Sequence, residues 1–111
     1  MNSALYIVGT PIGNLDDITS RALKILNTVD IIACEDTRHS KHLLSKFSIN
    51  KKLISLHQHN EKNKSEFLIK EIQNGKTIAY VSDAGTPGIS DPGSYLVNKA
   101  LDAKIKVVPI P

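Results

Sequence analysis

The chain has 111 residues, of which 41% are hydrophobic and 23% are charged, and its net charge is +3. This composition predicts one globular domain and excludes a disordered or low-complexity chain. A single cysteine, Cys34, excludes an internal disulfide, and the sequence has no apolar run long enough to cross a membrane. We therefore expect a protein of the reducing cytoplasm, with a mild preference for an anionic partner.

Short apolar runs alternate with stretches of helical periodicity along the chain. The strand-like runs are residues 5–8, 31–33, 53–56, 77–81 and 106–110. Successive residues in these runs are apolar, so both faces of each strand would be apolar, which is typical of strands that helices cover on both faces. The pattern predicts an α/β fold with a five-stranded, mostly parallel sheet and helices on both faces.

Four amphipathic helices are predicted between these strands, each preceded by a residue that can cap it. The expected caps are, in chain order, Asp16 or Asp17, Asp36 or Thr37, Asn60, and Asp91. The third helix is expected to end before Gly75, and the fourth to begin with Pro92 as its first helical residue.

The loops that follow parallel strands meet at one edge of the sheet. Here these loops are polar and span residues 9–14, 34–39, 57–61 and 81–95, whereas the opposite loops are plain turns such as Asn74-Gly75. This asymmetry predicts that the functional residues gather at the first edge.

The last of these loops has the most unusual composition, VSDAGTPGISDPGSY. Glycine allows a ligand to approach the backbone closely and proline stiffens the segment, while the hydroxyls and carboxylates add hydrogen-bonding groups without bulk. The loop suits a pocket for a polar small molecule. An ordinary turn between a strand and a helix is the alternative.

The other three loops each have two readings. The first, Gly9 to Gly13, lacks the spacing of a dinucleotide-binding fingerprint or a P-loop, so it is either a tight turn or part of a different site. His57 and His59 could face one side of an extended segment, but no further ligands follow at a suitable spacing, and we predict no metal site. Arg38 either belongs to a helix cap or holds a phosphate.

Several motifs occur together and in order over essentially the whole chain. They are LYIVGTPIGNL at residues 5–15, DIT at 17–19, CEDTRH at 34–39, HNE at 59–61 and SDAGTPGISDPG at 82–93. The combination resembles the branch of the tetrapyrrole methylase-like superfamily that acts on ribosomal RNA. True tetrapyrrole methylases have a glycine-richer first loop and begin the fourth with Gly-Asp-Pro, so the differences argue against a porphyrin substrate.

The resemblance implies S-adenosylmethionine-dependent 2′-O-ribose methylation of a cytidine in the decoding region of small-subunit rRNA. The partner would be that rRNA or the 30S particle. Enzymes of this kind have two α/β domains with the cofactor between them and are usually homodimers. Residues 1–111 would form the N-terminal domain, and we expect Pro111 to be an artificial end, with the C-terminal domain outside this chain. The alternatives are a tetrapyrrole methyltransferase or a non-catalytic α/β binding module.

The resemblance also implies site residues. The positions that match cofactor contacts are Ile12, Asp83, Ala84, Gly85 and Thr86. The candidates for substrate binding are Asn14, Arg38, His59 and Asn60. A ribose hydroxyl is a weak nucleophile that would benefit from a general base, and the candidates, which the sequence does not rank, are Asp83, Asp36, Glu35 and His59. Basic residues after the second loop (Arg38, Lys41, Lys46, Lys51 and Lys52) are interpreted as phosphate contacts or as a solvated helix face.

Overall fold

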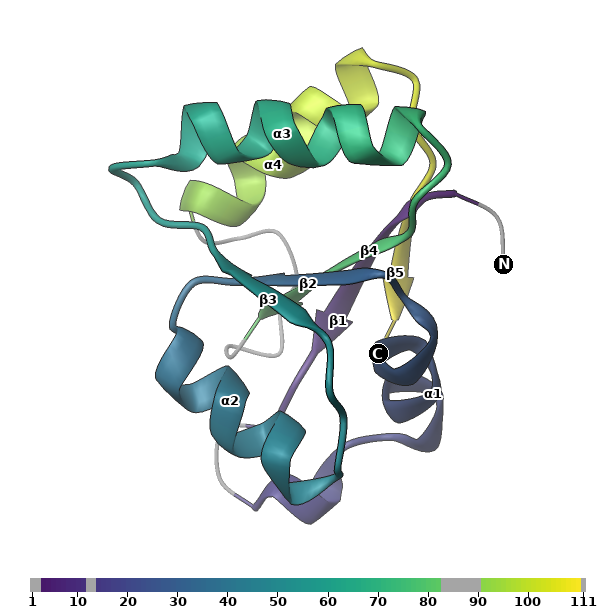
Figure 1. The fold of residues 1–111 in the computed structure, drawn as a ribbon, viewed down its shortest axis with the longest axis vertical. Helices are drawn as coiled ribbons and strands as arrows, with labels where there is room; N and C mark the ends of the chain where they lie inside the picture. Colours follow the sequence, from purple (N-terminus) through teal and green to yellow (C-terminus); the bar gives the residue numbers. More distant parts are fainter. Residues whose placement is uncertain (1–2, 12–13, 83–90, 111) are drawn as a thin grey trace.

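The computed structural model describes residues 3–11, 14–82 and 91–110. Strands and helices alternate along them (Figure 1). The strands are β1 (Leu5–Gly9), β2 (Ile31–Cys34), β3 (Lys52–Ser55), β4 (Ile78–Ser82) and β5 (Val107–Ile110). The helices are the 3-10 helix η1 (Leu15–Asp17) and the α-helices α1 (Ser20–Thr28), α2 (Thr37–Lys46), α3 (Glu61–Gln73) and α4 (Asp91–Asp102). The predicted βα alternation is confirmed, with strand boundaries shifted by about one residue.

The five strands form one sheet in the order β3-β2-β4-β1-β5, and every described pair is parallel. β4 lies at the centre, where Ile78 is in register with Leu5 of β1 and with Ile31 of β2. All five residues of β4 are buried. Burial on both faces explains why this strand is a continuous apolar run rather than an alternating one.

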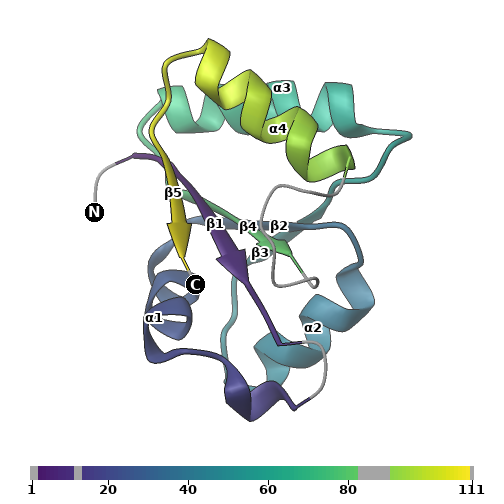
Figure 2. The same cartoon turned by 180° about the vertical axis from the view of Figure 1, so that it is seen from behind.

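Helices cover both faces of the sheet, with α1 and α2 on one face and α3 and α4 on the other (Figures 1 and 2). Successive strand residues point to opposite faces. Tyr6 and Val8 therefore pack with Leu26 and Leu43 under α1 and α2, while Leu5 and Ile7 pack on the α3 and α4 side. Each large apolar side chain buried in this way contributes roughly 1.5–3 kcal/mol of transfer free energy.

The start of α1 differs from the prediction that Asp16 or Asp17 caps it. The helix begins at Ser20, and the Thr19 side chain accepts a hydrogen bond from the backbone N–H of Ala22 at 3.1 Å. Asp16 and Asp17 instead belong to η1. Between them and Thr19, the buried Ile18 has extended backbone angles, φ −62° and ψ 140°, because its side chain packs into the core. This break separates η1 from α1.

The other helix boundaries follow the sequence closely. Asp36 caps α2, and α3 ends before Gly75, whose φ of +97° is the left-handed conformation expected of a C′ glycine. Asn60 precedes α3, as predicted, but its side chain makes no capping bond to that helix. α4 begins at Asp91, one residue before the predicted start at Pro92.

Asp30 and Thr77 join β2 and β4 at the edge where these strands begin. The Asp30 carboxylate accepts hydrogen bonds from the Thr77 backbone N–H at 2.9 Å and from its hydroxyl at 3.2 Å. In return, the Asp30 N–H donates to the Thr77 carbonyl at 3.0 Å. The Thr77 backbone bond is the main cause that lowers the pKa of Asp30 below its ordinary value of 3.8.

We predict that Asp30→Ala lowers the free energy of unfolding by about 1 kcal/mol at neutral pH, because buried Thr77 loses its charged acceptor at a site that water partly screens. The folded-state pKa lies below the unfolded value, so this stabilisation is present above pH 3.8 and is lost as the pH falls through the folded-state pKa. Urea unfolding near pH 7 and near pH 3 would measure it. An Asp102→Ala control, at an exposed position, should cost little at either pH; equal losses for the two variants near pH 7 would contradict the prediction.

Candidate functional site

The candidate site begins where the neighbouring strands β1 and β4 end. Thr10, buried just beyond β1, donates from its backbone N–H and from its hydroxyl to the carbonyl of Ser82, at 3.0 and 3.2 Å. These two bonds hold together the points at which the first and fourth loops leave the sheet. From there the chain continues to α1 on one face and to α4 on the other (Figure 2). In open α/β sheets, ligands bind where neighbouring connections leave on opposite faces.

The loops after β2 and β3 form a second part of the site at the same edge. The backbone N–H of Leu56 donates to the Cys34 carbonyl at 2.7 Å, and the Ser55 hydroxyl donates to the Glu35 carbonyl at 3.5 Å. These bonds bring the loop containing Glu35 next to the loop containing His57. In their described parts, the loops therefore meet in two pairs, the first with the fourth and the second with the third.

Asp36 caps α2, so the cap interpretation of this segment is confirmed. Its carboxylate accepts from the Arg38 backbone N–H at 2.9 Å and from the Arg38 Nε at 3.5 Å. The backbone bond from Arg38 is the main cause that lowers the pKa of Asp36. The Arg38 side chain is 92% exposed, so the guanidinium stays accessible to an anion from solution. A cap and a phosphate contact are compatible here.

The loop after β3 is organised by Asn60. Its side-chain carbonyl accepts from the His57 N–H at 2.8 Å, and its side-chain amide donates to the Ser55 carbonyl at 3.0 Å. The Nδ1 of His57 accepts from the His59 N–H at 3.2 Å, so a neutral His57 carries its proton on Nε2. The two imidazole rings lie edge to face with centroids 5.9 Å apart. The sequence predicted Asn60 as a site residue, but it did not indicate that the Asn60 side chain braces this loop.

The candidates for substrate binding form two groups. Arg38, His59 and Asn60 lie at the edge where β2 and β3 end. Asn14 is the exposed cap of η1, where its side chain accepts from the Asp16 N–H at 3.1 Å. An ion pair of 3.3 Å between Asp16 and Lys46 holds η1 against the last turn of α2, and Lys46 lies about 12 Å along the helix axis from Arg38. The structure therefore does not bring Asn14 together with the others.

The positions implied for cofactor contact, Ile12 and residues 83–86, lie outside the described residues, as does the Asp83 candidate base. The described residues near them, Thr10 and Ser82, form the pair of hydrogen bonds between β1 and β4, which we call the Thr10–Ser82 clamp. Within the described part of the chain, no group of three or more His, Cys, Asp or Glu side chains could hold a metal ion, and no helix is long and apolar enough to span a membrane.

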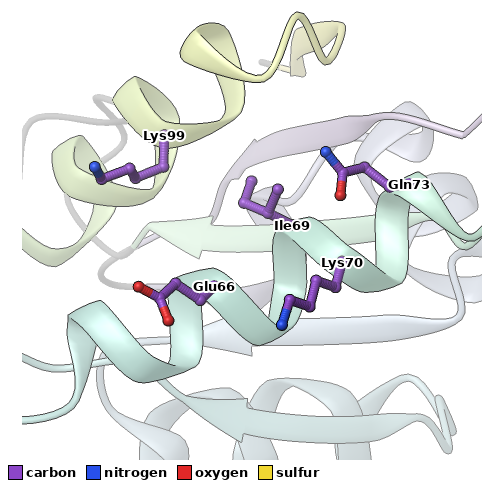
Figure 3. A pocket seen from close by; sticks show the side chains of 5 residues that line it. All are labelled: Glu66, Ile69, Lys70, Gln73 and Lys99. Carbon is purple, nitrogen blue, oxygen red and sulfur yellow. The ribbon is translucent and has the colours of Figure 1, made fainter.

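One surface cavity lies away from this edge, between α3 and α4 (Figure 3). Its volume is about 210 Å³, and its lining comes from Glu66, Ile69, Lys70 and Gln73 of α3 and from Lys99 of α4. No pattern in the sequence indicated it. It lies away from the loops at the strand ends, and the site described above does not use it.

Comparison with known proteins identifies the family. Residues 4–111 match the model of the Tetrapyrrole (Corrin/Porphyrin) Methylases. The chain therefore belongs to the tetrapyrrole methylase family.

Two solved structures have a similar fold. The uroporphyrin-III-C-methyltransferase from Thermus thermophilus has a TM-score of 0.74 and 18% identity, and the match covers 100% of this chain and 48% of that one. The cobalamin biosynthetic enzyme cobalt precorrin-4 methyltransferase has a TM-score of 0.79 and 20% identity, and the match covers 96% of this chain and 44% of that one. These similarities confirm the predicted α/β fold.

Sequence relatives with higher identity carry a different name. Two proteins named ribosomal RNA small subunit methyltransferase I are similar to this chain. The one from Pasteurella multocida (strain Pm70) is 58% identical over 100% of this chain and 40% of its own length, and the one from Escherichia coli O157:H7 is 59% identical over 96% of this chain and 37% of its own length. The chain thus spans about two fifths of the length of these relatives.

We predict that Asn60→Ala lowers the free energy of unfolding of this chain by about 1–2 kcal/mol, because the His57 N–H and the Ser55 carbonyl both lose a partly buried partner. Asn60→Asp keeps the acceptor and loses the donor, so its loss should be smaller. Urea unfolding, together with hydrogen exchange at the His57 amide, measures the effect. Asn63→Ala, at an exposed position on α3, serves as the control. Indistinguishable behaviour of the variants at positions 60 and 63 would show that Asn60 does not brace the loop.

Proposed function

We propose that the protein containing this chain is an S-adenosylmethionine-dependent methyltransferase that modifies the ribose 2′-OH of a cytidine in the decoding region of small-subunit rRNA. The observation that carries the proposal is the 58% identity, over the whole chain, to a protein named ribosomal RNA small subunit methyltransferase I. Membership of a methylase family supports the reaction class. Residues 1–111 would be the N-terminal α/β domain of a two-domain, homodimeric, cytoplasmic enzyme whose partner is the rRNA or the 30S particle.

The ends of β1 and β4 are the proposed place of the cofactor. They are two buried parallel strands whose connections lead to opposite faces, and the Thr10 to Ser82 bonds hold their ends together. Ile12, Asp83, Ala84, Gly85 and Thr86 would hold the cofactor from the two loops that this clamp joins. When bound, S-adenosylmethionine supplies a methyl group activated by a positively charged sulfur. In-line transfer requires alignment above all, so rigid strand ends can supply much of the rate enhancement.

The substrate would lie toward the loops that follow β2 and β3. Arg38 offers an exposed guanidinium to a phosphate, and Asn60 holds the loop that presents His59. Asp36 is a poor candidate for the base, because its carboxylate accepts hydrogen bonds from Arg38 that lower its pKa and make it a weaker proton acceptor than an ordinary aspartate. Within the described residues, no hydrogen bond engages the Glu35 carboxylate or the His59 ring nitrogens. The proposed base is therefore Glu35, His59 or Asp83.

Nucleoside mass spectrometry of small-subunit rRNA tests the function. RNA from cells that lack the full-length protein should lack one 2′-O-methylcytidine, and the purified full-length enzyme with S-adenosylmethionine should restore it on 30S particles. Residues 1–111 alone should be inactive, because a cofactor bound between two domains would have only part of its pocket here. An unchanged rRNA methylation pattern in the deletion cells, accompanied by loss of a methylated tetrapyrrole, would contradict the proposal in favour of tetrapyrrole methylation.

A further inference from the structure

A second surface cavity lies where the C-terminal half of α2 meets β3, and we call it the α2–β3 pocket. Its volume is about 260 Å³. Its floor is apolar and consists of Leu44, Ile49 and Leu53, of which Leu44 and Ile49 are about 95% buried, with exposures of 5% and 6%. The turn after α2 shapes it: Ser48 has a φ of 56°, and the Ile49 N–H donates to the Leu44 carbonyl at 2.8 Å. The floor therefore belongs to the folded core.

The rim of the pocket is polar and positively charged. It consists of Lys41, Ser45, Asn50 and Lys51. Among the described residues, neither lysine forms an ion pair. Among the described residues, the charge of Lys51 acts on Asp30, whose carboxylate is already bonded to Thr77.

The neighbouring lysines differ from these two, because each makes a close ion-pair or ring contact within the described residues. Lys46 pairs with Asp16 at 3.3 Å, and Lys52 lies over the ring of Phe67 at 5.4 Å. Lys41 and Lys51 are therefore the charges that an arriving anion would meet at this pocket.

This combination fits a nucleotide. A nucleobase has apolar faces and hydrogen-bonding edges, and it is linked to negatively charged phosphates. The aliphatic floor matches a base face, the Ser45 hydroxyl and the Asn50 amide can bond a base edge, and the two ammonium groups match the flanking phosphates. Proteins that read RNA commonly take up bases that have left the stack.

Two residues of the pocket also lie on the same side of α2 as Arg38 of the candidate site. Arg38, Lys41 and Ser45 are spaced so that they share one side of α2. Arg38 is in the first turn, at the edge where β2 and β3 end, and Ser45 lies about 10 Å farther along the helix axis. A single RNA strand can follow this side of the helix from the edge to the pocket.

We propose that the α2–β3 pocket binds one unstacked nucleotide of the RNA substrate, outside the methyl-transfer site, with its phosphates at Lys41 and Lys51. This inference rests on the proposed function, because it takes the substrate to be RNA. It adds a second anchoring point that would set how the RNA lies across the edge of the sheet.

The test measures binding of the full-length enzyme to unmethylated 30S particles at several salt concentrations. Ser45→Phe fills the pocket without changing charge, so it should weaken binding about tenfold and leave the salt dependence intact. Lys41→Ala and Lys51→Ala should each weaken binding and reduce the slope of log K against log salt by about one. Affinity for S-adenosylmethionine should stay unchanged in all three, which also shows that the variants are folded.

Matched controls lie on the opposite face of the sheet. Asn98→Phe on α4 adds the same ring to an exposed position, and Lys70→Ala on α3 removes the same charge. If Ser45→Phe binds 30S particles as tightly as Asn98→Phe does, the pocket takes up no nucleotide and the proposal is overturned, whatever the lysine variants do. Unaltered salt slopes for both lysine variants would overturn it as well. Binding and methylation by the unaltered enzyme test the proposed function separately, because they do not depend on this pocket.

Discussion

Parallel pairing on both sides of β4 is the constraint on which the rest of the molecule depends. The strand is buried along its whole length and bonds to β1 on one side and β2 on the other. Because all strands run in the same direction, every connection must cross a face as a helix, and every loop that follows a strand must emerge at one edge. The two helix layers and the single functional edge both follow from this pairing.

The two edges of the sheet are used differently. Where the strands begin, the Asp30 and Thr77 polar groups form hydrogen bonds with each other. Helices reach this edge through turns such as the one at Gly75. Where the strands end, the hydroxyls of Thr10 and Ser55 donate to the carbonyls of Ser82 and Glu35 and so join neighbouring loops, while the Arg38 guanidinium stays exposed. The Asp30–Thr77 pair therefore stabilises the edge where the strands begin, while the edge where they end joins the loops proposed to bind the cofactor.

The sequence predicted the strands well, because a strand covered on both faces must be apolar throughout, as β4 is. It also predicted the Asp36 cap and the turn at Gly75, which depend on local chemistry. It failed at Asp16 and Asp17, because the core position of Ile18, a tertiary effect, ends the local turn before α1 begins. The sequence also could not predict the order of the strands in the sheet, because a connecting helix has a similar pattern whichever position the next strand takes.

The sequence predicted only part of the site. Loop composition identified the edge, and parallel pairing brought Glu35, His57 and Asn60 together there. Composition could not show that η1 carries Asn14 toward the end of α2, or that the left-handed turn at Ser48 shapes a pocket beside β3. Both depend on how distant elements pack, which a local pattern does not encode.

Hydrogen–deuterium exchange of the full-length protein, with and without S-adenosylmethionine, tests the central claim that the edge at the strand ends holds the cofactor. The account predicts slower exchange on cofactor binding in residues 9–14 and 81–90, with no change in the turns at residues 27–30 and 74–77. Slower exchange at those turns or along α3 and α4, with the loops after β1 and β4 unaffected, would contradict it.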